Sequence, residues 1–256
     1  MAILDRKLWD VYVAPTGGDY SSIATALALG TDLRIYVDKG TYSETASCAV
    51  LANQRVYFDD VTINLGSGFY FGFTGNDSTI TGKVAVSGVG DAGHNTVFYG
   101  AGDRVNATGC DILVTATNLT PANDIYTVFL NGMDNSFLNV RTATYTYTGT
   151  SGAAADLAML VNACTQNYFN LTVGARNNDD GSSPAAVRGI ELQGNSSLNS
   201  FEVVVNGCTT TSGNGGTGVL INAGSNYNSF IGASRGSDLA NLTDSGTGNK
   251  TGNLAV

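Results

Sequence analysis

Charged residues and histidine are scarce in this sequence, and each shortage argues against a class of function. Charged residues make up 13% of the 256 residues, and the net charge at pH 7 is −9. A phosphate backbone is held by clustered lysine and arginine, but the 12 basic residues here are scattered. We therefore expect no binding to nucleic acid. The single histidine, His94, lies in a stretch typical of a turn and is too isolated to suggest a zinc site.

Cysteine is also rare, and its spacing is uninformative for metal or redox chemistry. The sequence contains no CxxC pair, and the four cysteines lie in or beside short apolar runs. They are Cys48, Cys110, Cys164 and Cys208. This placement predicts buried free thiols in preference to disulfides. We expect no metal and no cofactor.

Long hydrophobic runs are missing as well. No stretch approaches the roughly 18 apolar residues of a membrane span, and charge interrupts residues 1–9, unlike a secretory signal peptide. We expect a protein that does not insert into membranes. It either stays in the cytoplasm or leaves on a particle assembled inside a cell.

Glycine and short apolar runs are abundant. The chain has 33 glycines, and its hydrophobic residues, 43% of the total, fall in regularly spaced short runs, which favours many short strands over disorder. Residues 9–15 and 33–37 read as strands. Between them, residues 21–29 predict a helix that Ser21 or Ser22 can cap and that ends at Gly30.

A repeat begins near residue 53 and consists of a short apolar run, a polar turn and then, in the later units, Asn-x-Phe. The last hydrophobic residues of successive units lie 24 to 32 residues apart. They are Val56, Ile80, Val105, Phe137, Phe169, Phe201 and Phe230. Such intervals are typical of a solenoid with one turn per repeat, and the short β-branched or aromatic runs argue against helical repeats.

The predicted fold is therefore all-β, a parallel β-helix in which successive coils stack about 4.8 Å apart. It forms one structural domain: residues 1–45 hold the first strand, a capping helix and the first coil, 46–235 the remaining coils, and 236–256 a C-terminal cap. We expect a stacked asparagine column at one bend, Asn135, Asn167, Asn199 and Asn228, and an inner stack of Phe137, Phe169, Phe201 and Phe230.

Three aspartates are candidate catalytic residues. Asp77, Asp103 and Asp134 precede repeat hydrophobics by two or three residues, which predicts neighbouring coils about 5 Å apart. Glycoside hydrolysis uses two carboxylates about 5 to 9 Å apart. The alternative interpretation is that aspartate, like asparagine, suits a tight bend.

Two tyrosines are candidate binding or interface residues. Tyr145 and Tyr147 alternate with threonines and share a face of a predicted strand. Exposed tyrosines can stack on sugar rings or fill a subunit interface, and simple packing is an equal alternative. They lie in the segment 142–155, which, like 177–186, is polar and glycine-rich and interrupts the repeat as an excursion from the coils.

Two stretches near the N-terminus resemble the opening of a known superfamily. Residues 17–27 (GGDYSSIATAL) and 35–44 (IYVDKGTYSE) look like the capping helix and first coil of pectin-lyase-like right-handed β-helix proteins. The resemblance implies a single-stranded right-handed solenoid. The motifs that mark its pectinesterases, polygalacturonases and pectate lyases do not match this sequence, and what remains resembles the β-helical virion proteins of tailed phages.

That resemblance implies a non-enzymatic structural protein on the exterior surface of a virion. It would be a capsid decoration or cement protein, or part of a tail spike or fibre. The resemblance also implies a homotrimer that contacts other virion proteins, with a host surface glycan as a further candidate partner. The alternative is a polysaccharide depolymerase that uses Asp77, Asp103 or Asp134, or a glycan-binding module that uses Tyr145 and Tyr147.

Overall fold

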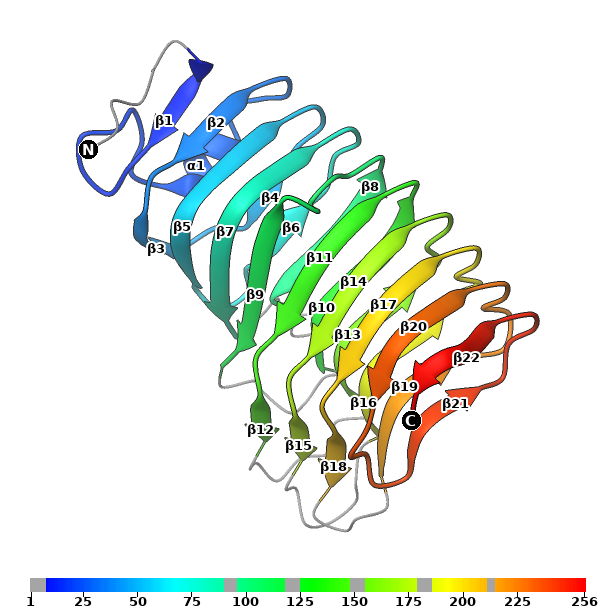
Figure 1. Cartoon of the computed structure of the whole chain (residues 1–256). Coiled ribbons are helices and arrows are strands. Elements are labelled where there is room, and N and C mark those ends of the chain that lie inside the picture. The colour runs from blue at the N-terminus through cyan, green and yellow to red at the C-terminus, as the bar shows by residue number, and fades with distance from the viewer. Residues whose placement is uncertain (1–7, 90–95, 118–124, 148–154, 179–185, 211–214) are drawn as a thin grey trace.

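The computed structural model describes residues 8–89, 96–117, 125–147, 155–178, 186–210 and 215–256. In these ranges the protein is all-β, with one short helix, and the strands lie in three sheets with parallel pairing (Figure 1). This confirms the all-β prediction. The stacked parallel sheets are compatible with a parallel β-helix.

The largest sheet has eleven strands, and their order across the sheet follows their order along the chain. They are β1 (Val11–Val13), β2 (Arg34–Val37), β3 (Gly40–Glu44), β5 (Arg55–Leu65), β7 (Thr79–Gly88), β9 (Cys110–Ala116), β11 (Phe137–Thr142), β14 (Tyr168–Val173), β17 (Ser200–Val205), β20 (Ser229–Ser234) and β22 (Lys250–Ala255).

A second sheet has eight strands and a third has three. The second contains β4 (Cys48–Val50), β6 (Phe71–Phe73), β8 (Phe98–Asp103), β10 (Ile125–Asp134), β13 (Ala155–Asn162), β16 (Ala186–Gln193), β19 (Gly216–Ile221) and β21 (Ala240–Asp244). The third contains β12 (Tyr145–Tyr147), β15 (Arg176–Asn178) and β18 (Cys208–Thr210).

From β7 onward the chain moves to a different sheet with each new strand. We call one circuit through both large sheets a pass, and successive passes lie side by side from the N-terminal to the C-terminal end (Figure 1). The expectation that segments 142–155 and 177–186 leave the repeat is wrong for their described ends, because β12 and β15 pair in register within the third sheet. The alternation around Tyr145 predicts a strand, but strands as short as these carry no signal of the sheet that they join.

The predicted helix is α1 (Ile23–Leu27), and it packs against the first strands. As predicted, Ser22 caps it by accepting a hydrogen bond from the Thr25 backbone N–H at 3.2 Å. The buried Glu44 carboxylate also accepts from the Ile23 N–H at 2.6 Å and from the Ser22 hydroxyl at 2.7 Å. Three of the donors at the start of α1 are therefore satisfied without water.

One inward-facing position recurs in each pass of the large sheet and forms the central column of the core. Register places Ile35 beside Val56, and this column continues through later passes to aromatic residues. Its members are Ile35, Val56, Ile80, Ala107, Leu138, Phe169, Phe201 and Phe230. The Phe201 and Phe230 rings stack with centroids 4.6 Å apart and an interplanar angle of 5°.

The prediction that Phe137 belongs to this stack is wrong. Leu138 pairs with Phe169, whereas Phe137 pairs with Tyr168 and is 50% exposed on the outer face. The two residues are adjacent and both apolar, so the sequence pattern allows either register. Because side chains alternate across a strand, a slip of one residue exchanges the inner and outer faces. Val105 is likewise displaced from the column, by Ala107.

A buried asparagine ladder runs along the bend before the large sheet. The Asn167 Nδ2 donates to Asn199 Oδ1 at 2.9 Å, and Asn199 Nδ2 donates to Asn228 Oδ1 at 3.0 Å. Each Oδ1 also accepts a backbone N–H from the preceding pass, as between Asn167 N and Asn199 Oδ1 at 3.1 Å. Asn228 continues the ladder to Asn249, which the sequence pattern did not include.

The placement of Asn135 in this ladder is wrong for the same one-residue reason. Ser136 occupies the buried position, where its backbone N–H donates to Asn167 Oδ1 at 2.8 Å. Asn135 is exposed and takes a left-handed backbone conformation with φ of 49°. Serine and asparagine both accept backbone hydrogen bonds, so the identity of the residue did not reveal the register.

The four cysteines are free and buried, as predicted. Desolvation by burial raises the pKa of each thiol, to about 12 for Cys110, Cys164 and Cys208. Thiols with such pKa values are poor nucleophiles near neutral pH. Among the described residues, no helix combines the length and apolar character needed to cross a membrane.

The asparagine ladder predicts a large stability difference between two asparagines. Asn199→Ala should lower the free energy of unfolding by about 3 kcal/mol, because Asn167 and Asn228 lose buried amide partners. Asn170→Ala, at a half-exposed position of β14, should change it by no more than about 0.5 kcal/mol. Urea denaturation followed by circular dichroism measures both. Equal losses would contradict a special role for the ladder.

The corrected register predicts an equally clear contrast between two phenylalanines. Phe169→Ala should lower the free energy of unfolding by about 3 to 5 kcal/mol, because it leaves a cavity in the buried column. Phe137→Ala, on the outer face, should cost about 0.5 kcal/mol in the dilute monomer. The same denaturation experiment tests the contrast, and a larger loss at Phe137 would restore the original register.

Candidate functional site

The three predicted aspartates lie at a bend where each pass enters the large sheet. One residue per pass is left-handed there, including Asn53, Asp77, Arg104 and Asn135 with φ of 58°, 57°, 55° and 49°. The backbone N–H of this residue donates to the next pass: Asp77 N to Asp103 O and Arg104 N to Asp134 O, both 2.9 Å. Side chains from successive passes are thereby brought next to each other.

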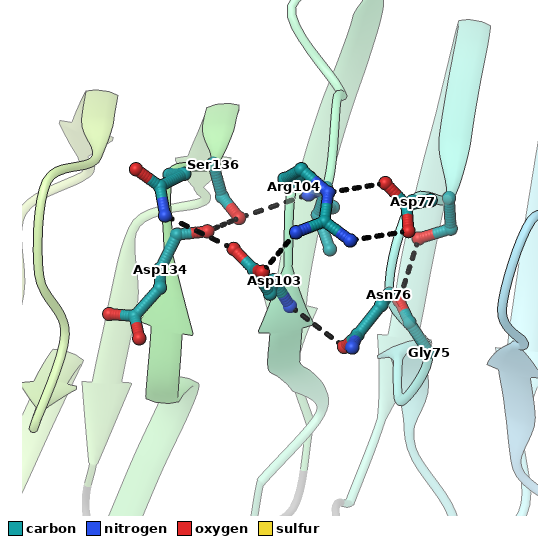
Figure 2. Close-up of polar contacts among 10 residues, drawn as sticks. Gly75, Asn76, Asp77, Asp103, Arg104, Asp134 and Ser136 are labelled. Carbon is teal, nitrogen blue, oxygen red and sulfur yellow. Dashed lines mark hydrogen bonds and ion pairs between the residues drawn. The ribbon is translucent and has the colours of Figure 1, made fainter.

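Arg104 bridges two of the aspartates (Figure 2). Its Nε and Nη2 donate to the two carboxylate oxygens of Asp77 at 2.6 and 2.8 Å. Its Nη1 donates to Asp103 Oδ2 at 2.6 Å. A planar guanidinium can hold two carboxylates in this way because its five donors point in fixed directions.

Asp134 belongs to the same edge but has different partners. Its Oδ1 accepts from the Thr165 backbone N–H at 3.1 Å and also from the Thr165 hydroxyl. Asn135 Nδ2 donates to Asp103 Oδ1 at 3.3 Å, which links this pass to the preceding one. The three aspartates therefore come from neighbouring passes, as the spacing predicts, and each is engaged in hydrogen bonds.

The electrostatics at Asp77 oppose a role for this residue as a general acid. The Arg104 side-chain hydrogen bonds hold the pKa of Asp77 below its ordinary value of 3.8, and the same pairing raises the pKa of Arg104. A general acid in glycoside hydrolysis needs a raised pKa, which Asp77 lacks. Within the described ranges, no group of three or more His, Cys, Asp or Glu side chains is arranged to hold a metal ion.

The two predicted tyrosines lie on β12, but only one side chain can be described. The Arg176 guanidinium lies 4.8 Å from the centroid of the Tyr145 ring, and the ring packs partly against the core. One face of Tyr145 is thus occupied by Arg176. The side chain of Tyr147 lies outside the described residues, as do His94 and the segments 148–154 and 179–185. The binding role of this pair stays a prediction.

Arg176 also forms a buried ion pair that the sequence did not suggest. It is 1% exposed, and its Nε donates to Asp156 Oδ1 at 2.6 Å while its Nη1 donates to the Thr127 hydroxyl at 2.8 Å. Asp156 is fully buried on β13. The two residues are 20 positions apart and on different sheets, so only the fold reveals the pair.

Arg104 was missed for a different reason, and a sequence signal could have found it. It lies 27 residues after Asp77, which is within the range of one repeat. An opposite charge one repeat away, on a column expected to stack, predicts an ion pair across passes. The signal is the basic residue directly after Asp103 in the sequence.

Comparison with known proteins adds no relationship. No protein-family model matches the sequence, and no curated protein and no solved structure matches the chain significantly.

The Arg104 bridge predicts an abnormal titration for Asp77. In carboxyl-carbon NMR, Asp77 should titrate below pH 3.8, and Arg104→Gln should return its midpoint to about 3.8. Because the folded pKa is lowered, the stabilisation by this pair is present above pH 3.8 and is lost as pH falls through the folded pKa. Lys83→Gln, which removes the Asp60 ion pair, is the matched control. An Asp77 midpoint unchanged by Arg104→Gln would contradict the bridge.

Proposed function

We propose that this chain is a right-handed parallel β-helix that acts as a non-enzymatic structural protein on the exterior of a tailed-phage virion. In this role it is a capsid decoration or cement protein, or a component of a tail spike or fibre, and assembles as a homotrimer. The stacked parallel sheets and the pectin-lyase-like stretches at 17–27 and 35–44 support the β-helix.

The observation that carries the assembly proposal is an exposed apolar surface. It lies on the outer side of β11, β17 and β20 and on the bend beside them, and we call it the apolar face. Its members are Phe137, Leu198, Val204, Tyr227 and Ile231, each between 37% and 62% exposed. Exposed large apolar side chains on one side of a sheet are candidates for contact with another chain.

A further copy of this chain is the partner that we propose for the apolar face. In a closed cyclic trimer the three contacts are heterologous and identical by symmetry, so a face turned towards the three-fold axis in one copy is turned towards it in all three. Glu202 lies beside this face on β17, and its carboxylate accepts a hydrogen bond from the Tyr168 hydroxyl at 2.7 Å. That bond satisfies part of the hydrogen-bonding demand of the carboxylate in an interface.

We call the bend that holds Asp77, Asp103 and Asp134 the acidic bend. Its contacts support a structural role over the depolymerase alternative. Asp77 and Asp103 are held by Arg104, and Asp134 by Thr165, so their partners belong to the same stack of passes. The Arg104–Asp77 and Thr165–Asp134 contacts each join one pass to the next and strengthen the stack. The glycan-binding alternative is weakened at Tyr145, where Arg176 covers one face of the ring.

Sedimentation equilibrium tests the assembly proposal. The wild-type chain should sediment with three times the protomer mass of 26.4 kDa. Ile231→Glu should yield monomers with an unchanged circular dichroism spectrum, because it puts an unpaired charge into the apolar face. Leu29→Glu, at a residue 46% exposed beside α1, is the control and should leave the trimer intact.

A stable monomer at micromolar concentration would overturn the proposal. So would a trimer that Ile231→Glu leaves intact, because the apolar face would then not form the contact.

A further inference from the structure

The bends that precede the strands of the large sheet lie in one row along the molecule (Figure 1). The left-handed residue of each bend donates its backbone N–H to the next pass, as Leu198 N does to Asn226 O at 3.2 Å and Tyr227 N to Thr247 O at 2.9 Å. Residues at this position therefore stack about 4.8 Å apart, and we call the series the bend row. Its members are Asn53, Asp77, Arg104, Asn135, Gln166, Leu198 and Tyr227.

Leu198 and Tyr227 are out of place in the bend row by their backbone conformation. Their φ values are 59° and 57°, in the left-handed region where a β-carbon crowds the following carbonyl oxygen. Asparagine and aspartate are the side chains best tolerated there. Among the described non-glycine residues with positive φ, Leu198 and Tyr227 are the only large apolar ones. The needs of the bend itself therefore do not explain these two residues.

Burial within the chain does not explain them either, since Leu198 is 55% exposed and Tyr227 62% exposed. The Tyr227 ring rests against Gly248, where a β-carbon would lie 2.7 Å from the ring atoms Cδ1 and Cε1. One side of the ring is thus held by the following pass while most of its surface is free. Disfavoured backbone conformations that persist in a fold cluster at functional sites. We therefore looked for a partner that covers both residues.

The composition of the bend row indicates what can cover it. A rotation axis that runs along the row brings each member next to its own symmetry copies, and like charges brought together in this way repel. The first half of the row includes the charged Asp77 and Arg104, whereas the members from Asn135 to Tyr227 are uncharged. Only this second half is compatible with contact between identical residues. Tyrosine is also enriched at the cores of subunit interfaces, from which charged residues are depleted.

We infer that the three-fold axis of the assembly runs beside the C-terminal half of the bend row. The three copies of Leu198 then form one layer and the three copies of Tyr227 form the next, about 4.8 Å further along the axis. This inference rests on the proposed trimer and adds the position of its axis. Burial of both side chains in the trimer offsets the cost of their left-handed backbone.

Leu198→Asn separates this role from a purely local one, because its two effects have opposite signs. Asparagine relieves the backbone strain, so in the Ile231→Glu background it should raise the midpoint of thermal unfolding. In the otherwise wild-type chain it should raise the dissociation constant of the trimer about tenfold or more, because the apolar layer is lost. Thermal melts and sedimentation equilibrium measure the two effects.

Gln166→Asn is the matched control. Gln166 is an exposed member of the same row with φ of 57°. The substitution relieves the same strain but exchanges one amide for another, so it should raise the melting midpoint and leave trimer dissociation unchanged. An equal weakening of the trimer by both variants would contradict a specific role for Leu198.

Cysteine crosslinking tests directly whether the three copies approach each other at Leu198. The native cysteines are buried, so an introduced thiol is the one that reacts. In dilute protein, Leu198→Cys treated with a short bismaleimide should give covalent dimers and residual monomers on a denaturing gel, because one linker joins two of three thiols. Thr146→Cys, on exposed β12 at the opposite end of the pass (Figure 1), should remain monomeric on the gel.

The outcomes distinguish this inference from the assembly proposal. A wild-type trimer that Leu198→Asn does not weaken, or in which Leu198→Cys fails to crosslink, would overturn the position of the axis and leave the trimer standing. Crosslinking of Thr146→Cys to the same extent as Leu198→Cys would also overturn that position. A monomeric wild-type chain would overturn both proposals.

Discussion

Parallel register is the constraint on which the rest of this structure depends. Every described strand pairs with a strand one pass away, so paired residues are 21 to 32 positions apart in the chain. Residues at equivalent positions of successive passes therefore form columns. The side chains within a column must be able to pack against one another. The buried Asn167, Asn199 and Asn228 meet this requirement because an amide has both donors and an acceptor, so each one bonds to the next.

Charged side chains are harder to stack in a column than amides, because like charges repel. Arg104 and Arg34 show two different arrangements of a stacked arginine. At the acidic bend, Arg104 follows Asp77 in one column, so opposite charges meet and the pair is closed within the protein. In β2 and β5, Arg34 meets Arg55, and Asp10 compensates only the first. The first arrangement ties passes together, whereas the second places like charges side by side on neighbouring strands.

Much of the fold was predictable, and the errors have one cause. The helix cap at Ser22, the parallel strands and the ladder at Asn167 follow from local patterns of capping, alternation and repeat spacing. The inward position in β11 does not, because Phe137 and Leu138 are adjacent and both apolar. Of the candidate site, the repeat spacing predicts the grouping of the aspartates, whereas the bridge through Arg104 depends on the register that sets Arg104 beside Asp77. The contact between Glu44 on β3 and the start of α1 could not be predicted from the residues around Glu44 in the sequence.

The sequence by itself determined the class of structure, because short apolar runs, glycine-rich turns and a regular repeat suit strands that stack in parallel and little else. It also determined that the cysteines are buried, since they lie within those runs. Only the tertiary structure decided which face each repeated side chain occupies and which charges meet, as at Asp156 and Arg176. The physical reason is that backbone hydrogen bonds set the register between passes, and a shift of one residue costs nothing in local sequence preference but inverts every side chain.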